Sequence, residues 1–254
     1  MPHNDHDSVL RFHAPKRRGT GSCMSSKLGT ALSLAAAVLL GLAGQAGAAT
    51  TDNLQHLVDT NGSLSIGDKT FSGFDYHESN LTSFDASNIQ VTASNNGGQY
   101  YLTWAGNMSL TSNSGPASAD LVLNYNVTAT SGLIDMLDQL YTGSAQPPGG
   151  AFLSVDETAR DANGNLVGNS HLQADDLSDP FAEPGDNLNI NPPQNFLSVT
   201  KDIGMGISSN SGGFINISEV RQSFHQVPEA STTAMLFLGL ALVGITTFRQ
   251  KLRA

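Results

Sequence analysis

The sequence predicts an all-β protein, an antiparallel β-sandwich of the jelly-roll type, over residues 49–226. Three observations favour this fold class: short segments in which apolar and polar residues alternate, turns rich in Gly, Asn and Ser between them, and little sign of helix. Alternation with a period of two places one face of each strand against a core. The number of such segments, eight or more, is typical of a sandwich of two sheets.

The region is expected to open with a short helix. Leu54, Leu57 and Val58 repeat at helical spacing, and Thr51 and Asp52 stand before them as possible caps. After this helix the period of the apolar residues changes from helical spacing to two.

The strands are expected at 71–76, 89–91, 100–104, 120–128, 151–160, 166–167, 196–207 and 214–224. Residues 133–141 fit a helix or a strand equally well. The segment 173–195 contains four prolines and five acidic residues, and we expect it to be a long loop.

The N-terminal part indicates export. Residues 1–23 have no apolar periodicity and are expected to be a leader that is disordered, or not translated, ahead of a start at Met24. Residues 24–48 are typical of a signal peptide, with Lys27 as its charged region, an apolar core over 28–42 and a small-residue cleavage site at 46–48.

The cysteine content and the charge of the sequence exclude some kinds of site and ligand for the exported domain. Cys23 is the single cysteine and lies in the leader, so the exported domain has neither a disulfide nor a cysteine-based metal site. Of the 22 acidic residues 19 lie within 50–226, against four of the 12 basic ones, so this region carries a net charge near −15. Such a surface repels nucleic acid.

The C-terminal residues 227–254 predict a membrane segment. An uncharged apolar run over 230–248 follows Pro228 and Glu229, and the basic tail 249–254 closes the chain with Arg249, Lys251 and Arg253. Nineteen helical residues reach about 28 Å, close to the ~30 Å hydrocarbon core of a bilayer. The basic tail should stay on the cytoplasmic side of the membrane.

These residues resemble the PEP-CTERM sorting signal of Gram-negative bacteria that produce exopolysaccharide. The resemblance implies an exosortase-type membrane protease that cuts near Pro228 and Glu229 and passes the protein to the cell surface. Ala230 stands where the family's second proline is usual. Segments such as 65–76 and 197–205 are similar to segments of exported domains that carry this tail. A plain anchor that is never cut is the alternative interpretation.

Several aromatic residues could form a platform on which a sugar ring stacks. Trp104 and Tyr101 are the candidates for this role, near Tyr100 and Tyr125. Tyr125 shares strand parity with Leu121 and Leu123, which favours the core for this side chain. Trp104 could equally be buried.

An acidic segment offers a weak candidate site for calcium. Asp175, Asp176, Asp179 and Asp186 are oxygen donors that a Ca²⁺ ion could neutralise, but their spacing differs from that of an EF-hand loop. A solvated acidic loop is the simpler interpretation. We expect no other cofactor and no metal.

No catalytic motif stands out. The exported histidines have no HExxH spacing, and no G-x-S-x-G turn is present. The sequence therefore predicts a protein without enzymatic activity.

One ion pair is expected inside the sandwich. Lys201 shares strand parity with Val199 and Ile203, and Glu157 shares parity with Val155, so both charged side chains point toward the apolar layer. A buried lone charge is costly, so the two should meet. A β-bulge that turns either outward is the alternative.

The expected function is that of a non-catalytic protein of the cell envelope or extracellular matrix, sorted through its tail and associated with exopolysaccharide. A carbohydrate-binding module at the cell surface is the first alternative, which an exposed aromatic strip on one sheet face would indicate. An unrecognised secreted hydrolase is the second, which a deep cleft with converging carboxylates would indicate.

Overall fold

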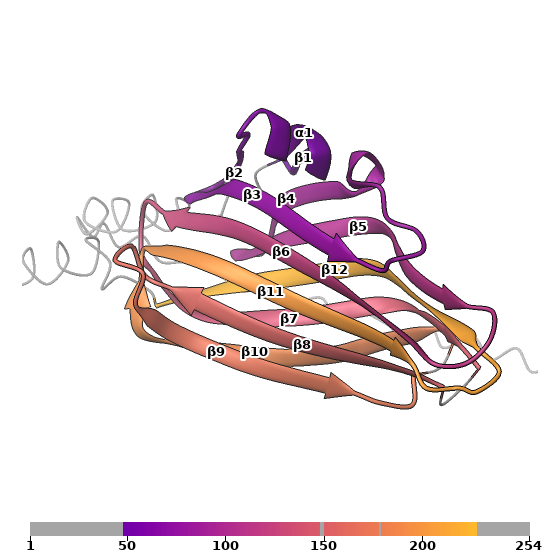
Figure 1. The fold of residues 1–254 in the computed structure, drawn as a ribbon. Helices are drawn as coiled ribbons and strands as arrows, with labels where there is room; N and C mark the ends of the chain where they lie inside the picture. The colour runs from indigo at the N-terminus through magenta and orange to yellow at the C-terminus, as the bar shows by residue number, and fades with distance from the viewer. Residues whose placement is uncertain (1–47, 148–149, 178, 228–254) are drawn as a thin grey trace, which may run out of the picture. The chain divides into compact units, whose positions relative to one another are not determined.

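Two six-stranded antiparallel sheets form the layers of a β-sandwich (Figure 1). The computed structural model describes residues 48–147, 150–177 and 179–227. Sheet I has the strand order β1-β4-β5-β12-β7-β10, and sheet II has the order β2-β3-β6-β11-β8-β9. The predicted fold class, an all-β sandwich, is confirmed.

The described elements, in chain order, are β1 (Thr50–Asn53), α1 (Leu54–Asp59), β2 (Leu64–Ile66), β3 (Lys69–Ser79), η1 (Ala86–Asn88), β4 (Gln90–Asn96), β5 (Gln99–Ser112), β6 (Ala117–Ala129), β7 (Leu133–Gln146), β8 (Ala151–Arg160), β9 (Leu166–Ala174), β10 (Phe181–Gln194), β11 (Phe196–Ile207) and β12 (Gly213–Val227). The strands from β5 onward make up a jelly roll: β5-β12-β7-β10 in sheet I faces β6-β11-β8-β9 in sheet II.

The alternation of inward and outward side chains along each strand determines which residues form the core. In β6, Leu121, Leu123, Tyr125 and Val127 are buried, while the residues between them are half-buried on the opposite face. β11 shows the same alternation and pairs with β6 in uninterrupted register from end to end. The regular register keeps every second side chain of both strands inside the sandwich.

The predicted helix is present as α1, but its cap differs from the prediction. Asn53 is the N-cap, and its side-chain Oδ1 accepts a hydrogen bond of 2.7 Å from the backbone N–H of His56. Thr51 and Asp52, the expected caps, lie two residues and one residue before Asn53, too far from the helix start to be its N-cap. Leu54 and Leu57 are buried, so the helix is held by packing on the edge of the sandwich.

Two segments became longer strands than the sequence suggested. The ambiguous 133–141 lies within β7 (Leu133–Gln146), a strand between β12 and β10. The prediction of a loop at 173–195 is wrong, because most of this segment is β10 (Phe181–Gln194). β10 is the last strand of sheet I, and its pairing with β7 shifts register twice, so an edge strand with irregularities accommodates the prolines.

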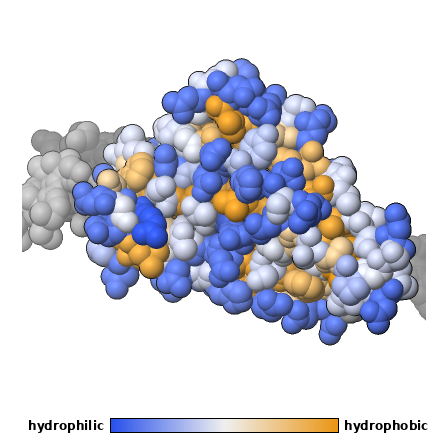
Figure 2. Space-filling model, viewed as in Figure 1, coloured by the Kyte–Doolittle hydropathy of each residue, from blue (hydrophilic) through white to orange (hydrophobic). Residues whose placement is uncertain are grey.

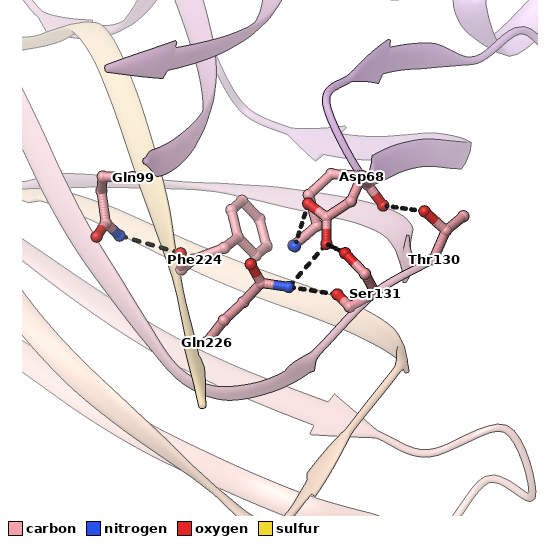
Figure 3. Close-up of polar contacts among 7 residues, drawn as sticks. Asp68, Gln99, Thr130, Ser131, Phe224 and Gln226 are labelled. Carbon is pink, nitrogen blue, oxygen red and sulfur yellow. Dashed lines mark hydrogen bonds and ion pairs between the residues drawn. The ribbon is translucent and has the colours of Figure 1, made fainter. Parts of the chain in front are cut away.

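Polar contacts join three chain segments near one end of the sandwich (Figure 3). The Asp68 carboxylate, in the β2–β3 turn, accepts hydrogen bonds from Gln226 Nε2 at 2.9 Å and Ser131 Oγ at 3.1 Å. The backbone oxygen of Asp68 accepts a bond from Thr130 Oγ1. Lys69 is buried, donates to the Asp68 carboxylate at 2.9 Å and lies 4.4 Å from the centroid of the Tyr100 ring. These contacts fix the β6–β7 turn and the end of β12.

The predicted export and sorting signals lie outside the described residues. This applies to residues 1–47 and to 228–254, which include Pro228, Glu229, Arg249, Lys251 and Arg253. Within the described ranges, no helix has the length and apolar character needed to cross a bilayer.

Candidate functional site

The outward face of sheet I carries a polar strip that crosses five strands. Strand pairing places one row of outward side chains directly opposite one another, consisting of Ser94, Tyr101, Ser223, Asp138 and Asn187. Side chains two positions further along a strand point to the same face of the sheet. A second outward row therefore lies beside the first and contains Thr103, Arg221 and Leu140. We call these two rows the sheet I track.

Two depressions lie along the sheet I track and share two residues. One, of about 340 Å³, is lined by Ser94, Asn96, Tyr101, Thr103, Glu219 and Arg221. The other, of about 300 Å³, is lined by Tyr101, Asp138, Gln139, Leu140, Asn187, Arg221 and Ser223. Tyr101 and Arg221 belong to both, so the depressions adjoin each other where β5 meets β12.

The shared residues combine an aromatic ring with a fork of hydrogen-bond donors. The guanidinium carbon of Arg221 lies 5.7 Å from the centroid of the Tyr101 ring. A stacked guanidinium is held in one orientation and directs its N–H groups outward. Glu219 and Asp138 add carboxylate acceptors nearby. Such a surface can recognise a polar molecule that has a flat apolar side and many hydroxyl groups.

Asp138 is contacted by two side chains from β12. Ser223 Oγ donates to Asp138 Oδ2 at 3.1 Å, and His225 Nε2 is in hydrogen-bond contact with the same oxygen. A nucleophilic relay requires the imidazole between the hydroxyl and the carboxylate. Here the carboxylate lies between the other two, so this arrangement positions Asp138 rather than activating Ser223.

The structure separates the two aromatic residues expected to bind sugar. Tyr101 is half-buried in the sheet I track, but Trp104 is only 1% exposed and its ring packs 5.3 Å from that of Tyr125. The prediction for Trp104 is wrong. The two positions differ by three in one strand and therefore face opposite sides of the sheet. This spacing is visible in the sequence and shows that the two rings cannot belong to one platform, although it does not say which ring is buried.

The aspartates proposed for calcium have separate partners. Asp175 accepts a hydrogen bond from Gln173, Asp179 accepts one from Gln146, and Asp186 accepts one from the backbone of Asn187. Asp176 lies in the turn region before β10 with a φ of 56°. Throughout 48–147, 150–177 and 179–227, no group of three or more His, Cys, Asp or Glu side chains is placed to hold a metal.

Glu157 and Lys201 meet inside the sandwich. They are directly opposite each other on β8 and β11, and Lys201 Nζ lies 2.9 Å from Glu157 Oε1, with both side chains fully buried. Pairing between these strands is regular at this point, so no bulge turns either residue outward. Burial raises the pKa of Glu157 and lowers the pKa of Lys201, in each case against the attraction between the two groups.

Sheet I contributes two further polar side chains to this site. Lys201 Nζ donates a hydrogen bond of 2.9 Å to Gln139 Oε1, and Tyr141 Oη donates one of 2.8 Å to the same oxygen. Both residues are buried on β7. We call Glu157, Lys201, Gln139 and Tyr141 the buried polar cluster. The sequence did not reveal Gln139 and Tyr141, because their segment was ambiguous between helix and strand.

The outward face of sheet II carries a pair of interacting carboxylates. Burial, followed by the hydrogen bond and repulsion from Asp202, raises the pKa of Asp120 to about 6. Such a shift is what a general acid requires. However, Asp202 is exposed and Asp120 is half-buried. The face of the sandwich in Figure 2 mixes hydrophilic and apolar residues. Partial burial, together with the hydrogen bond and repulsion from Asp202, explains the shift without a catalytic role.

Comparisons with known proteins show only distant structural likeness. No protein-family model and no curated protein matches the sequence. The solved structures that resemble the chain include TmCBM61 in complex with β-1,4-galactotriose, with 12% identity and a TM-score of 0.30 over 69% of this chain and 99% of that one. The CBM36-1 domain of a xylanase from the hindgut metagenome of Trinervitermes trinervoides matches with 13% identity and a TM-score of 0.25 over 60% and 100%.

A viral structure is similar to the same degree. Infectious bursal disease virus, Gx strain, matches with 11% identity and a TM-score of 0.29 over 73% of this chain and 56% of that one. Sugar-binding and viral proteins thus match about equally. These likenesses carry no argument about what the chain binds.

Proposed function

We propose that the sandwich is a non-catalytic carbohydrate-binding domain that holds a polysaccharide in the sheet I track. The observation that supports this proposal is the pair of adjoining depressions that share Tyr101 and Arg221. A sugar polymer presents repeated units along its length, and adjacent depressions suit adjacent units. The ring of Tyr101 offers apolar area to the C–H side of a sugar. Arg221 and the neighbouring carboxylates can form hydrogen bonds with the hydroxyl groups of the sugar.

Charge favours a neutral polysaccharide over an acidic one. Residues 50–226 carry 19 acidic and four basic residues, so long-range repulsion opposes an anionic polymer. Among the residues that line the two depressions, Glu219 and Asp138 are the carboxylates and Arg221 is the only Lys or Arg. Carboxylates accept hydrogen bonds from hydroxyl groups but repel uronic acid or sulfate groups.

Binding should depend on the residues that both depressions share. We expect the Tyr101→Ala and Arg221→Ala variants to bind a neutral polysaccharide at least tenfold more weakly, a loss of about 1.4 kcal/mol or more. Affinity electrophoresis through gels that contain neutral or acidic polysaccharides measures this change. Far-UV circular dichroism establishes that each variant keeps its fold.

Phe152→Ala is the matched control for this experiment. Phe152 lines an apolar depression of about 460 Å³ beside β6 and β11 in sheet II, away from the track. Its removal deletes comparable aromatic area and should leave binding unchanged. If Phe152→Ala abolishes binding while Tyr101→Ala and Arg221→Ala retain it, or if none of a range of neutral polysaccharides retards the protein, the proposal fails.

The resemblance of the C-terminal tail to a sorting signal adds a cellular location to the proposed function. We infer that the tail 227–254 holds the chain in the inner membrane until an exosortase-type protease cuts near Pro228 and Glu229. The domain would then act at the cell surface or in the extracellular matrix. Cell fractionation with mass-spectrometric mapping of the mature C-terminus tests this inference, and surface protein that retains Arg253 would contradict it.

A further inference from the structure

In the buried polar cluster, the amine of Lys201 lies between the carboxyl group of Glu157 and the side-chain amide of Gln139. Lys201 Nζ lies 2.9 Å from both Glu157 Oε1 and Gln139 Oε1. The side-chain carbonyl carbon of Gln139 is bonded to that oxygen at about 1.2 Å, so it lies within about 4.1 Å of the amine. A modest shift brings the amine to the ~3–3.5 Å at which a nucleophile attacks a carbonyl.

The surroundings of the cluster activate both partners for this attack. Burial lowers the pKa of Lys201 and raises the pKa of Glu157, so burial favours the neutral form of each group against the attraction between them. A neutral amine is a nucleophile, whereas an ammonium group is not. Tyr141 Oη donates to Gln139 Oε1 at 2.8 Å, where negative charge develops during attack on the amide.

We propose that Lys201 and Gln139 join spontaneously in an intramolecular amide crosslink, with Glu157 as the proton carrier. The lone pair of Lys201 Nζ forms a bond to the Gln139 side-chain carbonyl carbon, and the carbonyl electrons move onto Oε1. Glu157 takes one proton from Nζ and gives one to Gln139 Nε2. The carbon–Nε2 bond then breaks with its electron pair, the carbonyl re-forms and ammonia leaves. No oxidant, metal or external reactant is needed.

The structure favours Gln139 over Glu157 as the acyl group. Both oxygens of Glu157 are buried and lack a well-angled hydrogen bond among the described residues, so nothing polarises that carboxyl group except the amine itself. Gln139 Oε1, in contrast, accepts from Tyr141 as well as from Lys201. The leaving nitrogen of Gln139 lies 3.4 Å from Ser170 Oγ, and Ser170 is half-buried, which provides a direction toward solvent.

The crosslink would join the two sheets covalently. β7 belongs to sheet I and β11 to sheet II, and the two residues are 62 positions apart in the chain. The one cysteine, Cys23, precedes the described region, so no disulfide can provide such a link within residues 48–227. An exported sandwich would thereby gain a permanent connection through its core. This inference is independent of carbohydrate binding.

Peptide mass spectrometry of the full-length protein tests the proposal. The protein is denatured, digested with trypsin and analysed without reducing agent. We expect the peptides that contain Gln139 and Lys201 to be recovered as one species, lighter than their sum by one ammonia, with no cleavage after Lys201. Separate peptides with an unmodified Lys201 would overturn the proposal, and a joined species lighter by one water would assign the bond to Glu157 instead of Gln139.

Two variants separate the chemistry from a structural role. Glu157→Gln keeps the size of the side chain but removes the proton carrier, so we expect unjoined peptides. Gln222→Leu is the matched control: Gln222 is a second buried glutamine, directly opposite Gln139 on β12, and should leave the crosslink intact. A crosslink that persists in Glu157→Gln contradicts the role of Glu157. Because the wild-type digest decides by itself, a variant that fails to fold does not weaken the test.

Discussion

Replacing Lys201 with methionine is expected to lower the free energy of unfolding by about 3–5 kcal/mol, because it leaves the Glu157 carboxyl group buried without its partner, and by about 4 kcal/mol more if the wild-type lysine is crosslinked. Methionine preserves most of the side-chain volume, so the loss reports on charge and hydrogen bonding rather than on a cavity. Chemical denaturation followed by far-UV circular dichroism measures the change.

The loss of unfolding free energy in Lys201→Met should depend on pH, and the direction of this dependence follows from the pKa of Glu157. Burial raises the pKa of Glu157 above its ordinary value. An acid whose pKa is raised in the folded state stabilises the fold below its unfolded pKa of about 4.3, and this contribution is lost as the pH rises through the folded value. The Lys201→Met penalty should therefore be smaller near about pH 4 than near about pH 7. An equal penalty at both would contradict this explanation.

The double variant, Glu157→Leu with Lys201→Met, is the control for the pair. Replacing both charges by apolar groups removes the uncompensated carboxyl group, so the double variant should be more stable than Lys201→Met alone. If Lys201 and Gln139 are not joined, it should match the wild type closely. If they are joined, it should remain below the wild type by about 4 kcal/mol, the chain entropy of closing a loop of 62 residues.

Truncation of Trp104 to alanine should be comparably severe. The side chain is 1% exposed, packs 5.3 Å from the Tyr125 ring and lies between Val91 on β4 and Val220 on β12. Deleting a buried indole leaves a cavity in addition to the lost burial, and we expect a cost of about 3–5 kcal/mol. Thermal and chemical unfolding, followed by circular dichroism, measure the cost.

Tyr101→Ala is the matched comparison, because Tyr101 lies on the same strand and faces outward. Its cost in stability should be about 1 kcal/mol or less, while polysaccharide binding is expected to fall. The two variants thus separate stability from recognition. If Trp104→Ala left stability unchanged but removed binding, the assignment of Trp104 to the core would be wrong.

Much of the fold could be predicted because it depends on local pattern. Leu123, Tyr125 and Val127 alternate with the polar residues Asn124 and Asn126, and the structure buries the three as predicted. The short strands β1 and β2 were missed, and so was the long strand β10. β10 has prolines and charges that suppress the pattern, and it exists because the edge of sheet I offers it a partner in β7. The cap of α1 is Asn53 because this residue directly precedes the first helical residue, Leu54, whereas Thr51 and Asp52 lie further from the helix start.

Only some residues of the candidate sites could be predicted from the sequence. Tyr101 was among the aromatic candidates, but nothing local connects it with Arg221, which is far away in the chain and becomes its neighbour through the pairing of β5 with β12. Gln139 and Tyr141 were missed for the same reason: their strand was ambiguous, and their partner Lys201 belongs to the opposite sheet.

The amino-acid sequence by itself determined which side chains face the interior, including the two charges Glu157 and Lys201, because strand geometry alternates with a period of two whatever the partner strand is. Only the tertiary structure decided which strands are neighbours and which interior groups touch across the two sheets. That choice depends on the register and stacking of strands distant in the chain, and these are set by the packing of the whole core rather than by any single segment.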